Sequence, residues 1–340
     1  MRAARLAHGL GCLLAAAALL GGCGGSGSSQ STATGGETAR SRPAPPASAF
    51  PRADGTSLGE LLKSADAASE LVVTPEATAF YEGANRYPFQ LTERDGGQVT
   101  DAEVALYLAK VPVARPGSKP RSGQKAGAAQ VQVQALDAPA IGPFPASIET
   151  LAAGPAPRGK TTAGGPEAAR VVYSAQLDFP AKGEWKVAAL IEHGGAMDAK
   201  VLSSASVGEF KRIPRPGAQA PLIHTPAGPN KVDYAEALGK EPIVLLFTTP
   251  QFCQSRVCGP VVEVSEQARR RFAGKAAFIQ MDIYNDNDPA RGVRPQVRAF
   301  HLPTEPWLFT IDRRGRISSA IEGAFGYELL RKAVEKVTSE

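Results

Sequence analysis

The sequence predicts a multidomain chain in which a β-sandwich is followed by an α/β domain. The chain has 340 residues, of which 43% are hydrophobic and 21% are charged. This is an ordinary globular composition, with length enough for two domains. From about residue 71 to residue 210, strand-forming residues alternate with turn residues, and no long helical period appears. From about residue 232 onward, helical periods alternate with short apolar runs typical of buried strands.

The first 22 residues have the pattern of a secretory signal peptide. Arg2 and Arg5 supply a positive end, and Gly11 to Leu20 forms a short apolar segment rich in alanine and leucine. A membrane-spanning helix needs about 20 apolar residues, whereas glycine-rich sequence interrupts this run directly after Leu20. We therefore expect residues 1–22 to be removed on export.

The motif Leu20-Gly21-Gly22-Cys23 resembles the lipobox of bacterial lipoproteins. The resemblance implies cleavage before Cys23 and attachment of lipid to its sulfur. The alternative is a plain signal peptide that carries a cysteine near its cleavage site. Residues 23–69 begin with sequence rich in Gly, Ser, Thr and Pro, which predicts a flexible tether. The expected location is the extracytoplasmic face of the cell membrane, where the lipid anchor holds the chain.

Residues 70–210 are expected to form a β-sandwich of immunoglobulin type. Turns such as Arg94-Asp95-Gly96-Gly97 separate runs of alternating apolar residues. The predicted strands are Phe80–Leu91, Val99–Leu108, Val131–Leu136, Val171–Phe179 and Gly183–Ile191. Two irregular insertions interrupt them, Pro112–Gly127 and Ala152–Gly165.

The segment Gly183-Glu184-Trp185 resembles the late hairpin of small extracytoplasmic immunoglobulin-like domains. That resemblance implies that Trp185 is buried in the core. We expect the sandwich to serve as a spacer or a partner-binding module, not as a second active site. A proline-rich segment, residues 211–230, is expected to be an extended linker to the next domain.

Residues 231–340 alternate between helical and strand patterns. The predicted elements are a helix at Tyr234–Leu238, a strand at Ile243–Phe247, a helix at Val261–Phe272, a strand at Ala277–Ile283, a brief helix near Val293–Phe300, strands at Trp307–Ile311 and Arg316–Ile321, and a helix at Tyr327–Val337. The turn Asp312-Arg313-Arg314-Gly315 joins the last two strands.

The order β-α-β-α-β-β-α in this region resembles the thioredoxin fold. Cys253 and Cys258 fall between the first strand and the long helix, where thioredoxin-like proteins hold their redox cysteines. Pro306 stands where the family has a cis-proline packed against the disulfide. The segment Phe309–Ile317 looks like a hairpin common in membrane-tethered thiol-disulfide oxidoreductases. The resemblance implies that Cys253, Cys258 and Pro306 are the catalytic residues, with protein thiols and disulfides as partners.

The number and placement of the cysteines agree with redox chemistry. Cys12 would leave with the signal peptide and Cys23 would be lipidated, so Cys253 and Cys258 are the thiols left in the mature chain. In an exported protein, such a close pair is a disulfide candidate. A thiolate is the reactive species, and the amino terminus of a helix lowers the pKa of a thiol. Gly259-Pro260 predicts such a helix start beside Cys258.

The spacing departs from the family pattern, because four residues separate these cysteines where two are usual. On one continuous helix, two cysteines at this spacing lie ~8 Å apart, which is too far for a disulfide. Cys253 is therefore expected on a loop before the helix. The spacing leaves open which of the two thiols attacks.

Two other functions stay open at this point. In the first, the Cys253–Cys258 disulfide is a structural clip in a redox-inert scaffold, such as an adhesion or assembly subunit. In the second, the resemblance is to Sco-type copper chaperones, which implies copper binding by Cys253, Cys258 and His301. Two mismatches weaken it: four intervening residues stand in place of the family's three, and His301 falls three residues early. Thiol-disulfide exchange itself needs no cofactor.

The charge distribution speaks against nucleic acid as a partner. The 38 basic and 33 acidic residues are scattered along the chain, and aromatic residues make up only 6% of it. A specific nucleic-acid binder gathers lysine and arginine on one element and interleaves aromatic residues. The short run Arg269-Arg270-Arg271 has the pattern of a solvated helix face.

Overall fold

The structure is a computed structural model that describes residues 40–65, 70–112, 135–151, 169–226, 230, 232–252 and 256–340. The predicted signal peptide and the predicted lipidation site, Cys23, lie outside these residues, as does nearly all of both predicted insertions. The chain from Ala39 to Glu340 forms one compact unit. Within the described part of the chain, no helix combines the length and the apolar character needed to cross a bilayer.

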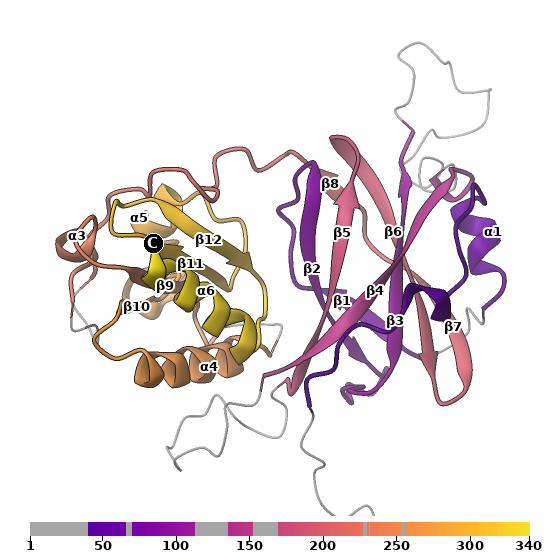
Figure 1. The fold of residues 1–340 in the computed structure, drawn as a ribbon, viewed down its shortest axis with the longest axis horizontal. Helices are drawn as coiled ribbons and strands as arrows, with labels where there is room; N and C mark the ends of the chain where they lie inside the picture. The colour runs from indigo at the N-terminus through magenta and orange to yellow at the C-terminus, as the bar shows by residue number, and fades with distance from the viewer. Residues whose placement is uncertain are drawn as a thin grey trace, which may run out of the picture. The chain divides into compact units, whose positions relative to one another are not determined.

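The first region is built on one eight-stranded sheet (Figure 1). Its strand order is β1-β2-β5-β4-β3-β6-β7, and β8 pairs with β6. The strands are β1 (Val72–Pro75), β2 (Gly83–Thr92), β3 (Glu103–Lys110), β4 (Ala140–Thr150), β5 (Val171–Phe179), β6 (Gly183–His193), β7 (Ala196–Val201) and β8 (Ala205–Val207). Neighbouring strands are antiparallel.

Strand β4 is the main difference from the sequence prediction. Gly142, Pro143 and Pro145 argue against a strand, because proline has no N–H for the ladder. The structure accommodates them by a register shift opposite Leu106 and Leu108 of β3. The strand expected at Val131–Leu136 lies mostly outside the described residues, and its last two residues are not in a strand.

The position of β4 also bears on the predicted fold class. Residues 140–145 of β4 pair with β3 and residues 146–150 pair with β5, so β4 passes from one group of strands to the other and connects them in one strand order. An immunoglobulin-type sandwich has two separate sheets. The immunoglobulin resemblance is therefore not confirmed, although β2, β3, β5 and β6 overlap the strands predicted there.

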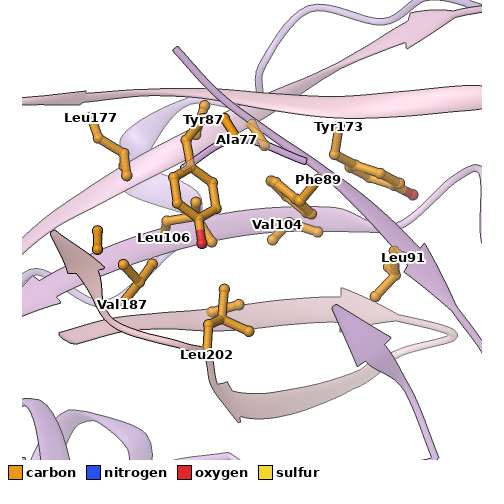
Figure 2. Packing of buried hydrophobic residues seen from close by; sticks show 14 of the residues in the cluster. Ala77, Tyr87, Phe89, Leu91, Val104, Leu106, Tyr173, Leu177, Val187 and Leu202 are labelled. Carbon is orange, nitrogen blue, oxygen red and sulfur yellow. The ribbon is translucent and has the colours of Figure 1, made fainter. Parts of the chain in front are cut away.

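The main core of this region lies between β2, β3, β5 and β6 (Figure 2). Phe89 of β2 stacks on Tyr173 of β5, with ring centroids 5.3 Å apart. Leu106 of β3 belongs to the same buried cluster. Trp185 is 4% exposed, and its indole N–H donates to the carbonyl of Ala181. The predicted burial of Trp185 is thus confirmed.

The opposite face of β3 is covered by residues near the start of the described chain. Tyr107 clusters there with Phe50 and with Leu58 and Leu61 of α1 (Leu58–Leu62). The Tyr107 hydroxyl donates to the carbonyl of Pro51 at 2.6 Å. The sequence places these residues in the tether, whereas the structure packs them on the sheet because they supply apolar side chains to it.

The second region has the predicted order of helices and strands (Figure 1). Its sheet runs β10-β9-β11-β12, in which β10 is parallel to β9 and the other pairings are antiparallel. The elements are α3 (Tyr234–Ala237), β9 (Ile243–Phe247), α4 (Cys258–Arg271), β10 (Ala277–Met281), α5 (Pro295–Ala299), β11 (Trp307–Ile311), β12 (Ile317–Glu322) and α6 (Tyr327–Ser339).

Helices cover both faces of this second sheet. Side chains of β9 alternate between two buried clusters, one with α3 and α5 and the other with α4 and α6. All five residues of β9 are therefore buried, which is why it reads as a continuous apolar run. This is the α/β layer arrangement that the resemblance to the thioredoxin fold implied.

The two regions share buried contacts. Leu151, Ala169 and Val172 of the first region belong to the same buried cluster as Cys258 and residues of α4 and α6. The segment predicted as a linker also packs on the second sheet, because the Gly217 N–H donates to the Ile317 carbonyl at 2.7 Å. The first region is thus in direct contact with the elements that carry the candidate site.

Candidate functional site

Cys258 is the first residue of α4 and is completely buried. Its sulfur takes part in a disulfide. Val257 is the N-cap residue, and Gly259 and Pro260 lie in the first turn, where a missing N–H costs no helical hydrogen bond. The prediction that a helix starts beside Cys258 is confirmed.

Cys253 lies outside the described residues, so its pairing with Cys258 stays a prediction. The chain on either side of it is described. The Phe252 N–H donates to the Thr249 carbonyl at 3.2 Å, and the Phe252 ring meets Tyr284 edge-on with centroids 6.0 Å apart. Phe252 is 41% exposed, which is unusual for an aromatic residue and places an apolar ring on the surface beside the predicted redox loop.

The chain after Cys253 is held by the first region. Arg256 has φ of 60°, in the left-handed region. Its carbonyl accepts a hydrogen bond from the Ala169 N–H at 3.2 Å. Ala169 precedes β5, so a backbone group of the first region fixes the residue that lies two positions before Cys258.

Pro306 directly precedes β11, and the Glu305-Pro306 peptide bond is cis. Pro306 is buried, and its carbonyl accepts from the Gly323 N–H at 2.9 Å. The isomer is the one that the resemblance implied at this position. The predicted contact between Pro306 and the disulfide stays a prediction.

Glu305 brings a partly buried carboxyl next to Pro306, and the sequence analysis did not single it out. Its Oε2 accepts from the Thr249 N–H, at the carboxyl end of β9. Burial raises the pKa of Glu305 to about 7, and the nearby Asp282 carboxyl acts in the same direction, while the Thr249 hydrogen bond opposes them. The site therefore holds a carboxyl that titrates near neutral pH.

Asp282 and Thr249 connect the ends of the two parallel strands. The Thr249 hydroxyl accepts from the Ile283 N–H at 2.7 Å, directly after Asp282. Burial raises the pKa of Asp282, and the positive charge of Arg294 partly offsets this. The carboxyl ends of β9 and β10 thus meet beside Glu305, where α/β sheets commonly place their functional groups.

Glu322 at the end of β12 is a further carboxyl that the sequence did not reveal, and it is buried. It is 9% exposed, and it accepts hydrogen bonds from the Thr78 N–H and the Ala79 N–H, both at 2.9 Å. It also accepts from the Thr304 hydroxyl at 2.6 Å. Burial raises the pKa of Glu322, and these donors act against that rise.

His301 is exposed and follows α5, with φ of 56°. It lies at the edge of a cavity of about 690 Å³ that Phe210, Lys211 and Arg298 also line. Among the described residues, no three His, Cys, Asp or Glu side chains gather closely enough to hold a metal ion. Since Cys253 is not described, the copper set of Cys253, Cys258 and His301 stays a prediction.

Sequence reasoning could not find Glu305 and Glu322, because a carboxylate in a sequence reads as a surface residue. The one available signal was position. Glu305 directly precedes the predicted cis-proline Pro306. Glu322 ends β12 and pairs with Trp307, the residue after Pro306. Their burial depends on Thr249 and on Thr78, which are distant in the chain.

Comparisons with known proteins return partial matches to solved structures. No protein-family model matches the chain, and no curated protein matches it. A thiol:disulfide interchange protein of the thioredoxin family from Chlorobium tepidum TLS matches 36% of this chain and 97% of its own, at 19% identity and a TM-score of 0.28. A thioredoxin-like protein solved in its oxidised form matches 38% of this chain and 96% of its own, at 17% identity and a TM-score of 0.28.

Proposed function

We propose that this chain carries out thiol-disulfide exchange with protein clients outside the cytoplasm, using the pair Cys253 and Cys258. The observation that carries the proposal is the disulfide of Cys258 at the first residue of α4, in a region with the predicted β-α-β-α-β-β-α order. The cis-proline Pro306 directly before β11 supports it. A helix amino terminus stabilises the thiolate that the exchange requires.

The burial of Cys258 assigns different parts to the two sulfurs. Because Cys258 is completely buried, a client cannot reach its sulfur directly. Cys253 is then the sulfur that forms the mixed disulfide, and Cys258 is the one that resolves it. Exposed Phe252 next to Cys253 offers an apolar contact to the client chain.

Oxidation of a client proceeds in two exchange steps. A client thiolate attacks the Cys253 sulfur, a client–Cys253 bond forms, and the Cys253–Cys258 bond breaks. The Cys258 thiolate takes up the proton that the client thiol released. A second client thiolate attacks the client sulfur of the mixed disulfide, so that Cys253 leaves as a thiolate and takes up the proton that the second client thiol released. The client loses two electrons and the pair gains them, and the reverse sequence reduces a client disulfide.

We place the protein on the outer face of the cell membrane. The support is the sequence motif at Cys23, with the positive and apolar segments before it. Two or more acyl chains hold a protein to a bilayer stably, whereas a single chain does not. Anchoring would confine the exchange to clients near that surface.

The test is turnover of a model protein disulfide by the mature chain with dithiothreitol as reductant. Cys253→Ser and Cys258→Ser are each expected to abolish turnover, because each removes one sulfur of the pair. Cys23→Ser is the matched control: it removes a cysteine outside the pair, so turnover stays at the wild-type level while the protein leaves the membrane fraction.

Unchanged turnover in either pair variant would remove the exchange proposal. A disulfide that resists the glutathione pool, with no turnover in the wild type, would identify the structural clip in a redox-inert scaffold. Stoichiometric Cu(I) binding that His301→Ala abolishes would identify the copper function.

A further inference from the structure

Besides the buried cluster around Cys258, the first region contacts the candidate site through backbone hydrogen bonds at two places. The Ala169 N–H donates to the Arg256 carbonyl, two residues before Cys258. The Thr78 and Ala79 N–H groups donate to the Glu322 carboxylate. This carboxylate also accepts a hydrogen bond from the hydroxyl of Thr304, two residues before Pro306. Each side of the predicted redox site is therefore connected to the eight-stranded sheet region.

The Glu322 carboxylate joins three segments that are far apart in the chain. One of its oxygens accepts from the Thr78 N–H, from the Thr78 hydroxyl at 3.1 Å and from the Thr304 hydroxyl at 2.6 Å. The other accepts from the Ala79 N–H at 2.9 Å. Two consecutive backbone N–H groups aimed at one carboxylate form an anion-binding arrangement that fixes its place. Thr78 and Glu322 are 244 residues apart.

The same carboxylate acts on the loop that ends at Pro306. The Thr304 oxygen also accepts from the Trp307 indole N–H at 3.2 Å, so Thr304 bridges Glu322 to the residue after the cis-proline. The Gly323 N–H donates to the Pro306 carbonyl at 2.9 Å. Glu322, which binds the first region, and its neighbour Gly323 thus hold the loop at Thr304 and at Pro306.

We propose that Glu322 is a positioning residue, through which the Thr78-Ala79 backbone fixes the loop Thr304-Glu305-Pro306 over the predicted disulfide. The proposal rests on the proposed thiol-disulfide exchange and gives the eight-stranded sheet region a part in it. That region is then a support for the reacting geometry rather than a spacer. Small misplacement of a positioned group costs up to about a hundredfold in rate.

The test measures how fast dithiothreitol reduces the disulfide of the full mature chain, and its equilibrium with glutathione. Thr304→Val removes one hydroxyl at nearly constant volume and cuts the link between Glu322 and the loop. Glu322→Gln exchanges the carboxylate for an amide that cannot accept from all of its donors. We expect each variant to change the reduction rate by about tenfold.

Glu149→Gln is the matched control. Glu149 also carries a carboxylate at the contact between the two regions. It accepts a hydrogen bond from the Gly326 N–H of the second region at 2.9 Å, and it pairs with Arg86 of the first region at 3.2 Å. It contacts the start of α6 and the Arg86 guanidinium, which donates to the backbone carbonyls of Glu322 and Ala324 but not to the Glu322 carboxylate that holds Thr304. We expect this variant to lower the melting temperature without changing the reduction rate.

Wild-type reduction kinetics in Thr304→Val would overturn the proposal, even if Glu322→Gln failed to fold. An equal change in Glu149→Gln would also overturn it, because general loosening of the contact would then explain the effect. The proposed function fails separately. A disulfide that dithiothreitol reduces but that never turns over a protein client would sink the exchange function, while the rates of the three variants would still decide the role of Glu322.

Discussion

Glu305 couples the stability of the protein to pH. Burial raises its pKa to about 7 from an ordinary 4.5, so the folded state holds this proton more tightly than the unfolded state does. The stabilisation from proton binding is complete below the unfolded pKa and is lost as the pH rises through about 7. Above that pH, Glu305 is a partly buried charge that accepts a hydrogen bond from the Thr249 N–H.

Glu305→Gln is expected to flatten this dependence, because glutamine stays neutral. Between about pH 5 and about pH 8, the melting temperature of the wild type should fall more steeply than that of Glu305→Gln. Thermal unfolding at several pH values measures this. Glu328→Gln serves as a control: the Arg331 side chain lowers the pKa of Glu328, so this carboxylate stays ionised throughout that pH range and its variant should keep the wild-type slope. Parallel pH profiles for the wild type and Glu305→Gln would contradict the assignment.

At the scale of the elements, Gly323 after β12 has little room for a side chain. Its φ is 76°, and a Cβ there would lie 2.4 Å from the Glu76 carbonyl oxygen, a backbone atom of the first region. Gly323→Ala is expected to cost more than the ~1–2 kcal/mol of a left-handed residue alone, because the Glu76 backbone must shift. Urea denaturation measures the difference in unfolding free energy.

Gly274 separates the two contributions to that cost. Its φ is 74°, yet a Cβ there would meet nothing within 4 Å. Gly274→Ala therefore reports the cost of the backbone conformation alone, about 1–2 kcal/mol. Equal losses for the two variants would show that the Glu76 backbone yields without cost.

The elements also show what the sequence could and could not predict. β9 and β11 were predicted to the residue, because a strand buried on both faces reads as a nearly continuous apolar run between turn residues, interrupted in β11 only by Thr310. Strand β4 was missed because Gly142, Pro143 and Pro145 are local signals against a strand. Its pairing with both β3 and β5 outweighs those signals, and such a pairing cannot be seen in the sequence.

The residues of the candidate site likewise include some that the sequence could predict and some that it could not. Cys258 and Pro306 could be found because their chemistry follows from their place in the order of elements. Glu305 and Glu322 could not, because the burial that makes them unusual comes from partners far away in the chain, such as Thr78 for Glu322. Position in the order of elements thus predicted Cys258 and Pro306 as candidate residues, whereas only the tertiary structure revealed the carboxyl groups near Pro306.

At the scale of the whole molecule, the buried cluster shared by the two regions predicts that they unfold together. Leu151, Ala169 and Val172 pack in one cluster with residues of α4 and α6, so loss of either region exposes apolar surface of the other. The two tryptophans of the chain lie in different regions, so the fluorescence of each follows the unfolding of its own region. Trp185 lies in β6 and Trp307 in β11.

Trp307→Phe leaves Trp185 as the probe of the first region, and Trp185→Phe leaves Trp307 as the probe of the second. Each variant is followed through urea unfolding by fluorescence and by far-ultraviolet circular dichroism. We expect the two signals to coincide within each variant, because a single cooperative transition moves every probe together. A fluorescence midpoint displaced from the circular dichroism midpoint in either variant would show that the regions unfold independently. The Glu322 contact would then be too weak to transmit the position of the Thr78-Ala79 backbone to the Pro306 loop.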